Sequence, residues 1–279
     1  MAGGTRPGVS TAGDLVRVAG VVPSTLTRDC DERMPVRVAD KQVLLLWDVD
    51  HTLIENSGVS KAVYARAFQI MTGSAPEAQP STDGRTDFDI MRNLFIANGT
   101  EFTVNDEALY PSALVSAMEE LHTRLMRDGF VLPGVTEVLE AVAKIPSIVQ
   151  SVLTGNIRPN AEAKLRLLGE HEHLLDLDVG GYGSDDVMRP RLVGAAQRKA
   201  SERYGVTFGP PSTVLVGDTE RDVAAALEGG AMIVGVATGI TSEEQLRQAG
   251  AHTVLPNLTD SAGFVRLIRE LTGRELEAV

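Results

Sequence analysis

Residues 43 to 52 read VLLLWDVDHT, five apolar side chains followed by two aspartates that are separated by one residue. An unbroken apolar run closed by polar residues is typical of a β-strand buried on both faces of a parallel sheet. Open parallel sheets bind their ligands just beyond the carboxyl ends of the strands. The stretch therefore predicts the first strand of the fold and places two candidate functional residues, Asp48 and Asp50, at its end.

Similar apolar runs recur at 148–153, 213–216 and 232–236, with a weaker one at 175–179. Helical periods fall between them, and an alternation of strands and helices predicts a parallel sheet with crossover helices. The fold class predicted from this order is α/β, with a doubly wound, Rossmann-like parallel sheet. Further helices are predicted around Val135 to Val142, from Pro190 to Tyr204, and from Arg221 to Leu227.

The alternation stops between about residues 57 and 129, where three helical patterns replace it, at 61–71, 87–97 and 112–128. Pro111 is predicted to begin the last of these helices. An all-helical block placed directly after the first strand predicts an inserted cap over the carboxyl edge of the sheet. The predicted organisation is a flexible extension (1–40), an α/β core (41–56 and 130–273) and an all-helical cap domain (57–129).

Composition excludes several classes of partner. The formal net charge of −12 argues against nucleic acid or an anionic membrane, because both would repel the chain. The single cysteine, Cys30, rules out a disulfide framework within the chain and favours a reducing compartment. No stretch reaches the roughly 18 apolar residues of a membrane span, and no signal-peptide pattern opens the chain. We therefore expect a cytoplasmic protein, of undetermined oligomeric state.

Polar clusters follow three of the predicted strands. Asp48 and Asp50 follow the first, Thr154 with Gly155 and Asn156 follows the second, and Asp218 with Asp222 follows the strand at 213–216. An isolated aspartate at a strand end is usually a turn former. Three clusters at equivalent ends converge on one spot, and carboxylates placed together repel unless a cation lies between them. Oxygen ligands without cysteine point to a hard ion, so the sequence predicts a Mg²⁺ site.

A carboxylate beside Mg²⁺ can attack phosphorus, because the ion screens the incoming phosphate from the negative nucleophile. Asp48, which ends the buried strand, is the candidate nucleophile and would form an aspartyl-phosphate. Asp50 is placed to protonate the leaving oxygen and then to activate water. The predicted function is Mg²⁺-dependent hydrolysis of a small phosphorylated metabolite, and the sequence does not name that substrate.

These motifs resemble the haloacid dehalogenase-like hydrolase superfamily, and within it the phosphoglycolate phosphatase-like branch with a helical cap. The run LLLWDVDHT matches the first motif, although the family usually has glycine where this chain has His51. Thr154 with Gly155 and Asn156 matches the second motif. Gly217-Asp218 with Asp222 matches the fourth. His51 is expected only to reshape the turn.

The resemblance implies a role for each matching residue. Asp48 would be nucleophile and metal ligand, and Asp50 acid/base and metal ligand through its backbone carbonyl. Asp218 would ligate the metal, with Asp222 as ligand or as a partner behind it. Thr154 and the backbone N–H groups of Gly155 and Asn156 would bind phosphate oxygens.

The third motif is normally a lysine before a helix, and Arg189-Pro190 occupies that place here. A guanidinium can balance the carboxylates and the transferring phosphoryl group with parallel hydrogen bonds. Arg191 and Lys199 are competing candidates for this cation. In the cap, Arg85 is predicted to contact the substrate from the loop 83–87, since the related branch uses the equivalent loop for its leaving groups.

Other readings of the same pattern stay open. A phosphomutase uses the same core but returns the phosphoryl group to its substrate. A non-catalytic scaffold would have no reason to keep a repulsive carboxylate cluster, and a phospho-accepting signalling domain would lack the helical insertion.

Two branches of the superfamily can be set aside. The dehalogenases lack the second aspartate of the first motif. The branch that cleaves phosphonoacetaldehyde uses a cap lysine, whereas Lys61 is expected on the solvated face of a cap helix.

Overall fold

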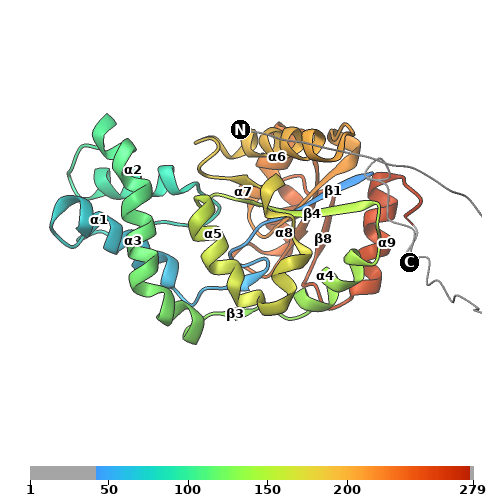
Figure 1. The fold of residues 1–279 in the computed structure, drawn as a ribbon, viewed down its shortest axis with the longest axis horizontal. Helices are drawn as coiled ribbons and strands as arrows, with labels where there is room; N and C mark the ends of the chain where they lie inside the picture. The colour runs from blue at the N-terminus through green and yellow to red at the C-terminus, as the bar shows by residue number, and fades with distance from the viewer. Residues whose placement is uncertain (1–41, 277–279) are drawn as a thin grey trace, which may run out of the picture. The chain divides into compact units, whose positions relative to one another are not determined.

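Within residues 42–276, which the computed structural model describes, six parallel strands form the central sheet in the order β5-β4-β1-β6-β7-β8 (Figure 1). The predicted extension, with Cys30, lies outside the described residues. The predicted doubly wound α/β class is confirmed. The strands are β1 (Val43–Trp47), β4 (Ile148–Thr154), β5 (Gly181–Tyr182), β6 (Thr213–Gly217), β7 (Met232–Val236) and β8 (Thr253–Leu255).

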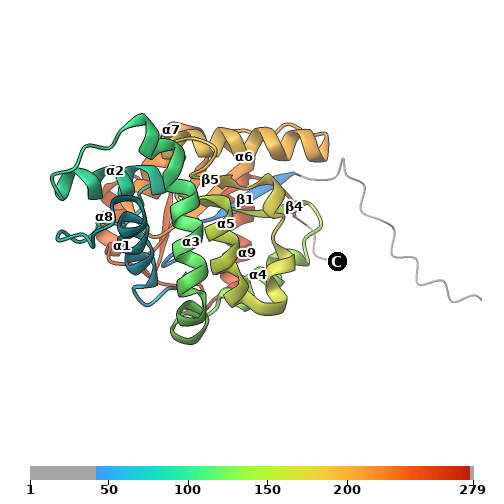
Figure 2. The same ribbon diagram turned by 60° about the vertical axis from the view of Figure 1, so that its left-hand side comes forward.

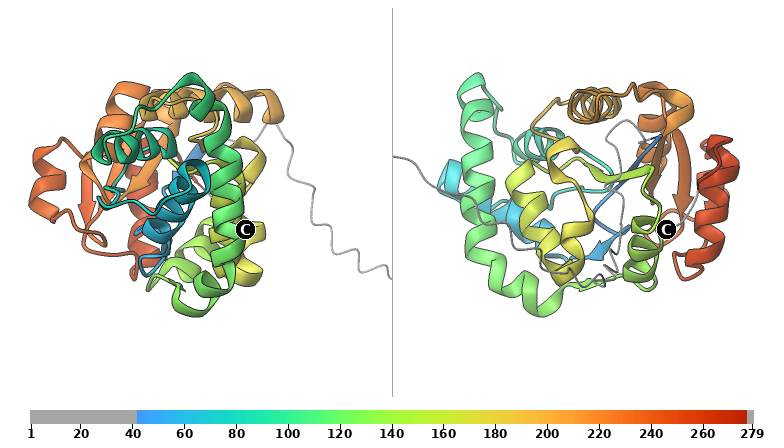
Figure 3. Two further views of the ribbon diagram at one scale, coloured as in Figure 1. Left: turned by 90° about the vertical axis from the view of Figure 1, so that its left-hand side faces the viewer. Right: turned by 45° about the vertical axis from the view of Figure 1, so that its right-hand side comes forward.

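The strand β1 lies between β4 and β6 and is fully buried, as its unbroken apolar sequence predicts. Successive side chains of a strand point to opposite faces, so Leu45 and Trp47 pack on one layer of helices while Leu44 and Leu46 pack on the other. Figures 1 and 3 show these layers, with α4 and α9 on one face and α6 and α7 on the other. The layers consist of α4 (Val135–Ala143) and α9 (Ser261–Thr272), and of α6 (Arg189–Tyr204) and α7 (Glu220–Gly229).

Shorter elements complete this part of the chain. The helix α5 (Arg158–Leu165) follows β4 after a short loop, and its buried face lies in the same region as the ends of the strands. No helix within residues 42–276 combines the length and the apolar character needed to cross a bilayer. The remaining elements are α5 (Arg158–Leu165), η2 (Arg166–Leu174), η3 (Leu177–Val179), η4 (Pro210–Ser212) and α8 (Glu243–Gln248).

The inserted block consists of α1 (Val59–Thr72), α2 (Asp87–Ala97) and α3 (Val104–Asp128), which share a hydrophobic cluster of their own. Figures 1 and 2 show α3 running beside α5 of the core, which contributes partly buried Ala163 to the same cluster. A short antiparallel pair, β2 (Ile54–Glu55) and β3 (Phe130–Val131), joins the block to the core. We propose 57–129 as the cap, because all three helices lie inside these bounds.

Two sequence predictions about single elements are wrong. The helix predicted to begin at Pro111 begins at Val104, because Thr103 and Asp106 form a capping box there and the helix continues through the proline. The weak run at 175–179 is not a strand. The Asp176 side chain accepts a hydrogen bond from the Asp178 N–H and bends the chain into the short helix η3, so the edge strand forms later, at β5.

Candidate active site

The first pair of carboxylates lies where the sequence places it, at the carboxyl end of β1. The backbone N–H of Asp48 still donates to Val216 of β6, 2.8 Å away, so the sheet itself fixes the position of this residue. The chain then turns at His51, which has a left-handed backbone (φ 62°). This conformation disfavours side chains with a Cβ, so glycine would be the least strained residue at this turn. Thr238 donates to the His51 carbonyl, 2.5 Å away, and stabilises the turn.

The second group of carboxylates follows β6. Asp218 comes directly after the strand and accepts a hydrogen bond from Thr52, 3.3 Å away. Asp222 lies in the first turn of α7, where it forms a capping box with Thr219 and accepts from both its N–H (3.0 Å) and its hydroxyl (2.6 Å). Oxygens of Asp48, Asp218 and Asp222 all lie within 4.8 Å of one another, and the three side chains are buried.

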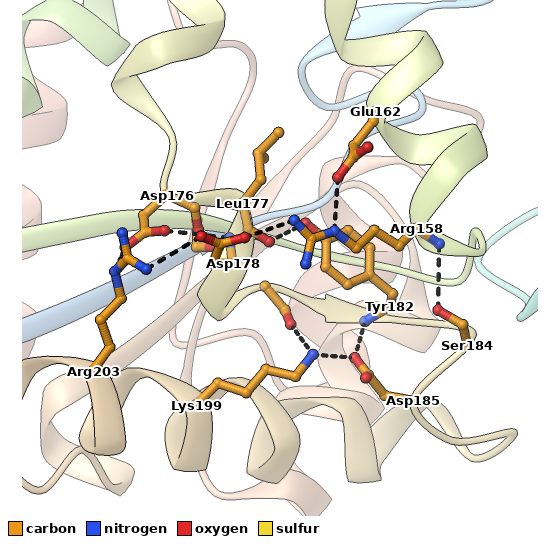
Figure 4. Close-up of polar contacts among 12 residues, drawn as sticks. Arg158, Glu162, Asp176, Leu177, Asp178, Tyr182, Ser184, Asp185, Lys199 and Arg203 are labelled. Atoms are coloured by element: carbon orange, nitrogen blue, oxygen red, sulfur yellow. Dashed lines mark hydrogen bonds and ion pairs between the residues drawn. The ribbon is translucent and has the colours of Figure 1, made fainter.

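Arg189, in the first turn of α6, provides a cation for this cluster. One of its terminal nitrogens donates to Asp48 Oδ1 over 2.9 Å and also contacts Asp222 Oδ1. The competing candidates lie elsewhere. Arg191 is exposed and pairs with Asp186, while Lys199 donates to Asp185 (2.7 Å) and to a backbone carbonyl, as Figure 4 shows. Among the three candidates, only Arg189 reaches the carboxylates.

One guanidinium does not neutralise this many buried carboxylates. Burial and the charge of Asp222 raise the pKa of Asp48 to about 7, against the lowering effect of Arg189. Burial and the charges of Asp222 and Asp48 raise the pKa of Asp218 well above its usual value. The cluster therefore has an excess of negative charge that a further cation would relieve.

The predicted phosphate loop follows β4. Thr154 is buried and accepts from the Asn156 N–H over 3.3 Å. A Cβ at Gly155 would come within 2.0 Å of the carbonyl oxygen of Arg85, so the close approach of the cap requires glycine here. Within the described chain, Asn156 Oδ1 and Arg189 Nε are buried without a hydrogen-bond partner. Such groups are rare unless a ligand or water completes them.

The cap loop before α2 is bound to this phosphate loop. The Asp87 N–H donates to the Gly155 carbonyl over 2.8 Å, and Asp87 Oδ2 accepts from the Ile157 N–H over 2.8 Å. Asp87 Oδ1 accepts from the Tyr64 hydroxyl over 2.6 Å. Burial raises the pKa of Asp87 to about 6, although the hydrogen bond from Tyr64 lowers it. One buried carboxylate therefore binds the cap loop to the phosphate loop of the core.

Arg85 precedes this anchor and lines the same small pocket as Asp48, Asp50 and Thr154, with a free volume of about 40 Å³. Its guanidinium is half-buried and has no hydrogen-bond or ion-pair partner among residues 42–276. A larger hollow of about 850 Å³ runs beside β4 and η2 and contains none of the predicted site residues. The predicted site residues Asp48, Asp50, Thr154 and Arg85 therefore share the smaller, polar pocket beneath the cap loop.

A second buried cation, Lys164 of α5, was not predicted from the sequence. Its ammonium donates to Asp50 Oδ2 over 2.5 Å, while Asn56 donates to Asp50 Oδ1 over 2.8 Å. Burial opposes ionisation of Asp50, but the charge and hydrogen bond of Lys164 outweigh it and lower its pKa. The sequence offers only a weak signal for this position, since Ala161 and Leu165, four residues apart on one face of the helix, are the apolar residues beside Lys164. Lys61, in contrast, is exposed on α1 as predicted.

Known proteins share this fold. A hydrolase from Pseudomonas syringae superposes with a TM-score of 0.61 at 20% identity, over 82% of this chain and 99% of that one. A predicted phosphoglycolate phosphatase from Haemophilus somnus 129PT gives 0.55 at 17% identity, over 81% and 98%. A "putative beta-phosphoglucomutase" from Bacteroides vulgatus gives 0.60 at 16% identity, over 85% and 92%.

Comparison of sequences adds a relative and a family to the similarity of folds. The "probable phosphatase IndB" of Dickeya dadantii (strain 3937) is 28% identical over 144 residues, which make up 52% of this chain and 60% of that protein. The alignment thus spans less than two thirds of the relative. The profile of the haloacid dehalogenase-like hydrolases matches residues 45–227, a segment that begins inside β1 and ends within α7. The chain therefore belongs to the haloacid dehalogenase-like hydrolase family.

Proposed function

We propose that the protein is a Mg²⁺-dependent phosphatase that hydrolyses a small phosphorylated metabolite through an aspartyl-phosphate on Asp48. One observation carries the proposal, namely the buried carboxylate cluster that faces a small polar pocket with Asp50 beside it. If this carboxylate cluster had no function, it would only destabilise the protein, because unpaired buried charges are costly. The single cysteine of the sequence supports a reducing, cytoplasmic location within this proposal.

The donor set fits Mg²⁺. The oxygens of Asp48 and Asp218 are close, buried and not fully neutralised, which is the environment that a hard divalent cation stabilises. Asp48, Asp218 and the Asp50 backbone carbonyl would hold the ion. Asp222 already binds Arg189 and Thr219, which favours a place behind the ligands. When bound, Mg²⁺ would neutralise the cluster and withdraw charge from the phosphoryl oxygens.

In the first half of the reaction, the Asp48 carboxylate attacks phosphorus and the bond from phosphorus to the substrate oxygen breaks. Arg189 holds the Asp48 carboxylate in place, and its unpartnered Nε–H is available to a phosphoryl oxygen. The Asn156 and Gly155 N–H groups and the Thr154 hydroxyl surround the same pocket and would bind the other oxygens. Asp50, which must bind a proton before this step although Lys164 lowers its pKa in the resting protein, gives that proton to the leaving oxygen.

In the second half, Asp50 takes a proton from a water molecule that attacks the phosphorus of the aspartyl-phosphate. Inorganic phosphate leaves and the Asp48 carboxylate is restored, so protons and bonds balance over the cycle. The cap loop bound over Gly155 restricts the entry of bulk water to the pocket. The small free volume beneath the loop favours a small substrate.

A panel of phosphorylated metabolites tests the proposal, with phosphate release measured with and without Mg²⁺. We expect release that EDTA abolishes and added Mg²⁺ restores. Conversion of a sugar phosphate into its isomer without phosphate release would instead identify a phosphomutase. No turnover of any compound, with Mg²⁺ present and the protein folded, would favour the non-catalytic scaffold.

A further inference from the structure

Lys164 is buried between the cap and the core. Only 2% of the residue is exposed, and it lines a small internal cavity with Tyr64, Asp87 and Asn160. A lysine is almost never fully buried unless it is paired, and here its ammonium is paired with Asp50 Oδ2 over 2.5 Å. Lys164 does not line the pocket that holds Asp48, so it faces the site from behind Asp50.

The Asp50 carboxylate is held by donors from three separate segments. Lys164 of α5 binds Oδ2, and Asn56, which precedes the cap, binds Oδ1 over 2.8 Å. Ser60 of α1 makes a longer contact with Oδ1, at 3.5 Å. Lys164 is the one charged member, and charge-assisted hydrogen bonds are about twice as strong as neutral ones. The direction of this carboxylate is therefore set mainly from the core helix.

We propose that Lys164 is a positioning residue that fixes the Asp50 carboxylate for proton transfer, as Arg189 fixes Asp48. This role rests on the proposed phosphatase function. Each carboxylate of the first motif would then have a buried cation of its own, from a different helix. Because Lys164 acts through Asp50 and does not touch the substrate pocket, its loss lowers the rate of turnover while substrate binding is preserved.

The test compares Lys164→Met with the wild type on one substrate of the active panel. We expect kcat to fall by about tenfold to a hundredfold, with KM changed less than about twofold. This loss is smaller than most of the roughly 10²- to 10⁴-fold that general acid–base catalysis contributes, because Asp50 itself stays in place and only its direction is lost. The matched control is Lys199→Met, which removes another lysine–aspartate pair of the core, and it should leave kcat and KM unchanged. A raised KM with unchanged kcat would overturn the proposal.

A double variant separates positioning from general support of the fold. In an Asp50→Asn background, Lys164→Met should produce no further loss of kcat, because residues that act as one unit are not additive. This double variant leaves neither partner of the pair charged, so it should fold even where Lys164→Met alone does not. A further loss of tenfold or more in the Asp50→Asn background would show that Lys164 acts independently and would overturn the proposal.

The wild-type assay distinguishes the two claims. A wild type that releases phosphate, with Lys164→Met equally active, leaves the proposed function standing and removes the role of Lys164. A folded wild type that is inactive on the whole panel overturns the proposed function and this role with it. Partial recovery of a Lys164→Ala variant by ethylammonium, but not by ethanol at equal concentration, is expected from a missing cation. Equal recovery by both would contradict the role.

Discussion

The edge of the core sheet and the cap loop that faces it use their cations in opposite ways. At the sheet edge, Arg189 and Lys164 are buried and each is already bound to a carboxylate of the first motif. In the cap loop, Arg85 is half-buried and unpaired among the described residues, although its neighbours Thr86 and Asp87 are buried and hydrogen-bonded. The core cations are thus already paired with carboxylates, whereas the cap loop keeps one arginine unpaired among residues 42–276, and we expect that arginine to bind the substrate.

Removing Arg189 from the carboxyl edge of the sheet should have the largest effect on turnover. Arg189→Met leaves Asp48 and Asp222 without their shared partner, and losing one preorganised donor of this kind lowers kcat by about 10²- to 10³-fold. Breaking a buried ion pair also destabilises a protein by about 3–5 kcal/mol, which thermal or urea unfolding would detect. Arg191→Met is the matched control, since that arginine is exposed and pairs with Asp186. Comparable losses in both variants would remove the contrast between core and surface cations.

Removing the cation of the cap loop should affect only some substrates. A guanidinium without a partner can pair with a second anionic group on the substrate, a contact of about 1–3 kcal/mol. We expect Arg85→Ala to lower kcat/KM by about tenfold to a hundredfold on a phosphomonoester that carries a carboxylate, but little on a neutral aryl phosphate. Arg92→Ala, an exposed arginine on α2, is the control. Equal losses on both substrates would place Arg85 in the core chemistry instead.

Asp87, which binds the cap loop to the core, should make the stability of the protein depend on pH. Because the pKa of Asp87 is raised to about 6, the folded protein holds a proton on this group that the unfolded chain has lost above pH 4. Stability from this group is therefore present at low pH and decreases as pH rises through about 4 to 6, by about 3 kcal/mol at most.

Asp87→Asn lacks this titration and serves as the comparison. The stability advantage of the wild type over Asp87→Asn should be greatest near pH 4 and smaller by about 1–3 kcal/mol at pH 7. Urea unfolding of both proteins across this range measures the difference, and the common titrations of the other groups cancel. A constant difference would show that Asp87 is charged throughout and that burial does not raise its pKa.

The sequence predicts the centre of the fold well and its edges poorly. The unbroken apolar runs of β1, β4, β6 and β7 identify strands that are covered on both faces. At the two edge strands of the sheet, β5 and β8, the unbroken apolar run is absent. All three residues of β8 are only half-buried, and β5 has two residues after a polar turn at Asp176. Edge strands depend on pairing with a neighbour, which a local apolar pattern does not encode.

The candidate site likewise has one part that the sequence predicts and another that it does not. Asp48, Asp50 and Asp218 follow strands, and the carboxyl ends of parallel strands meet, so their proximity is predictable from strand order alone. The position of Lys164 depends on how α5 packs against the cap, and its helix reads as polar in sequence. Thr86 caps α2 while Asp87 binds the core, a contact that no pattern in the sequence indicates. Contacts between distant segments were the part that local pattern could not reveal.

The central claim is that Asp48 becomes phosphorylated during turnover. Borohydride reduces an acyl phosphate to an alcohol, so quenching the wild type during turnover should convert Asp48 into homoserine, which peptide mass spectrometry detects. We predict this product at position 48 only when substrate and Mg²⁺ are both present, with Asp48→Asn folded but inactive. Phosphate release by Asp48→Asn at a rate near that of the wild type, or steady turnover without modification at position 48, would contradict it.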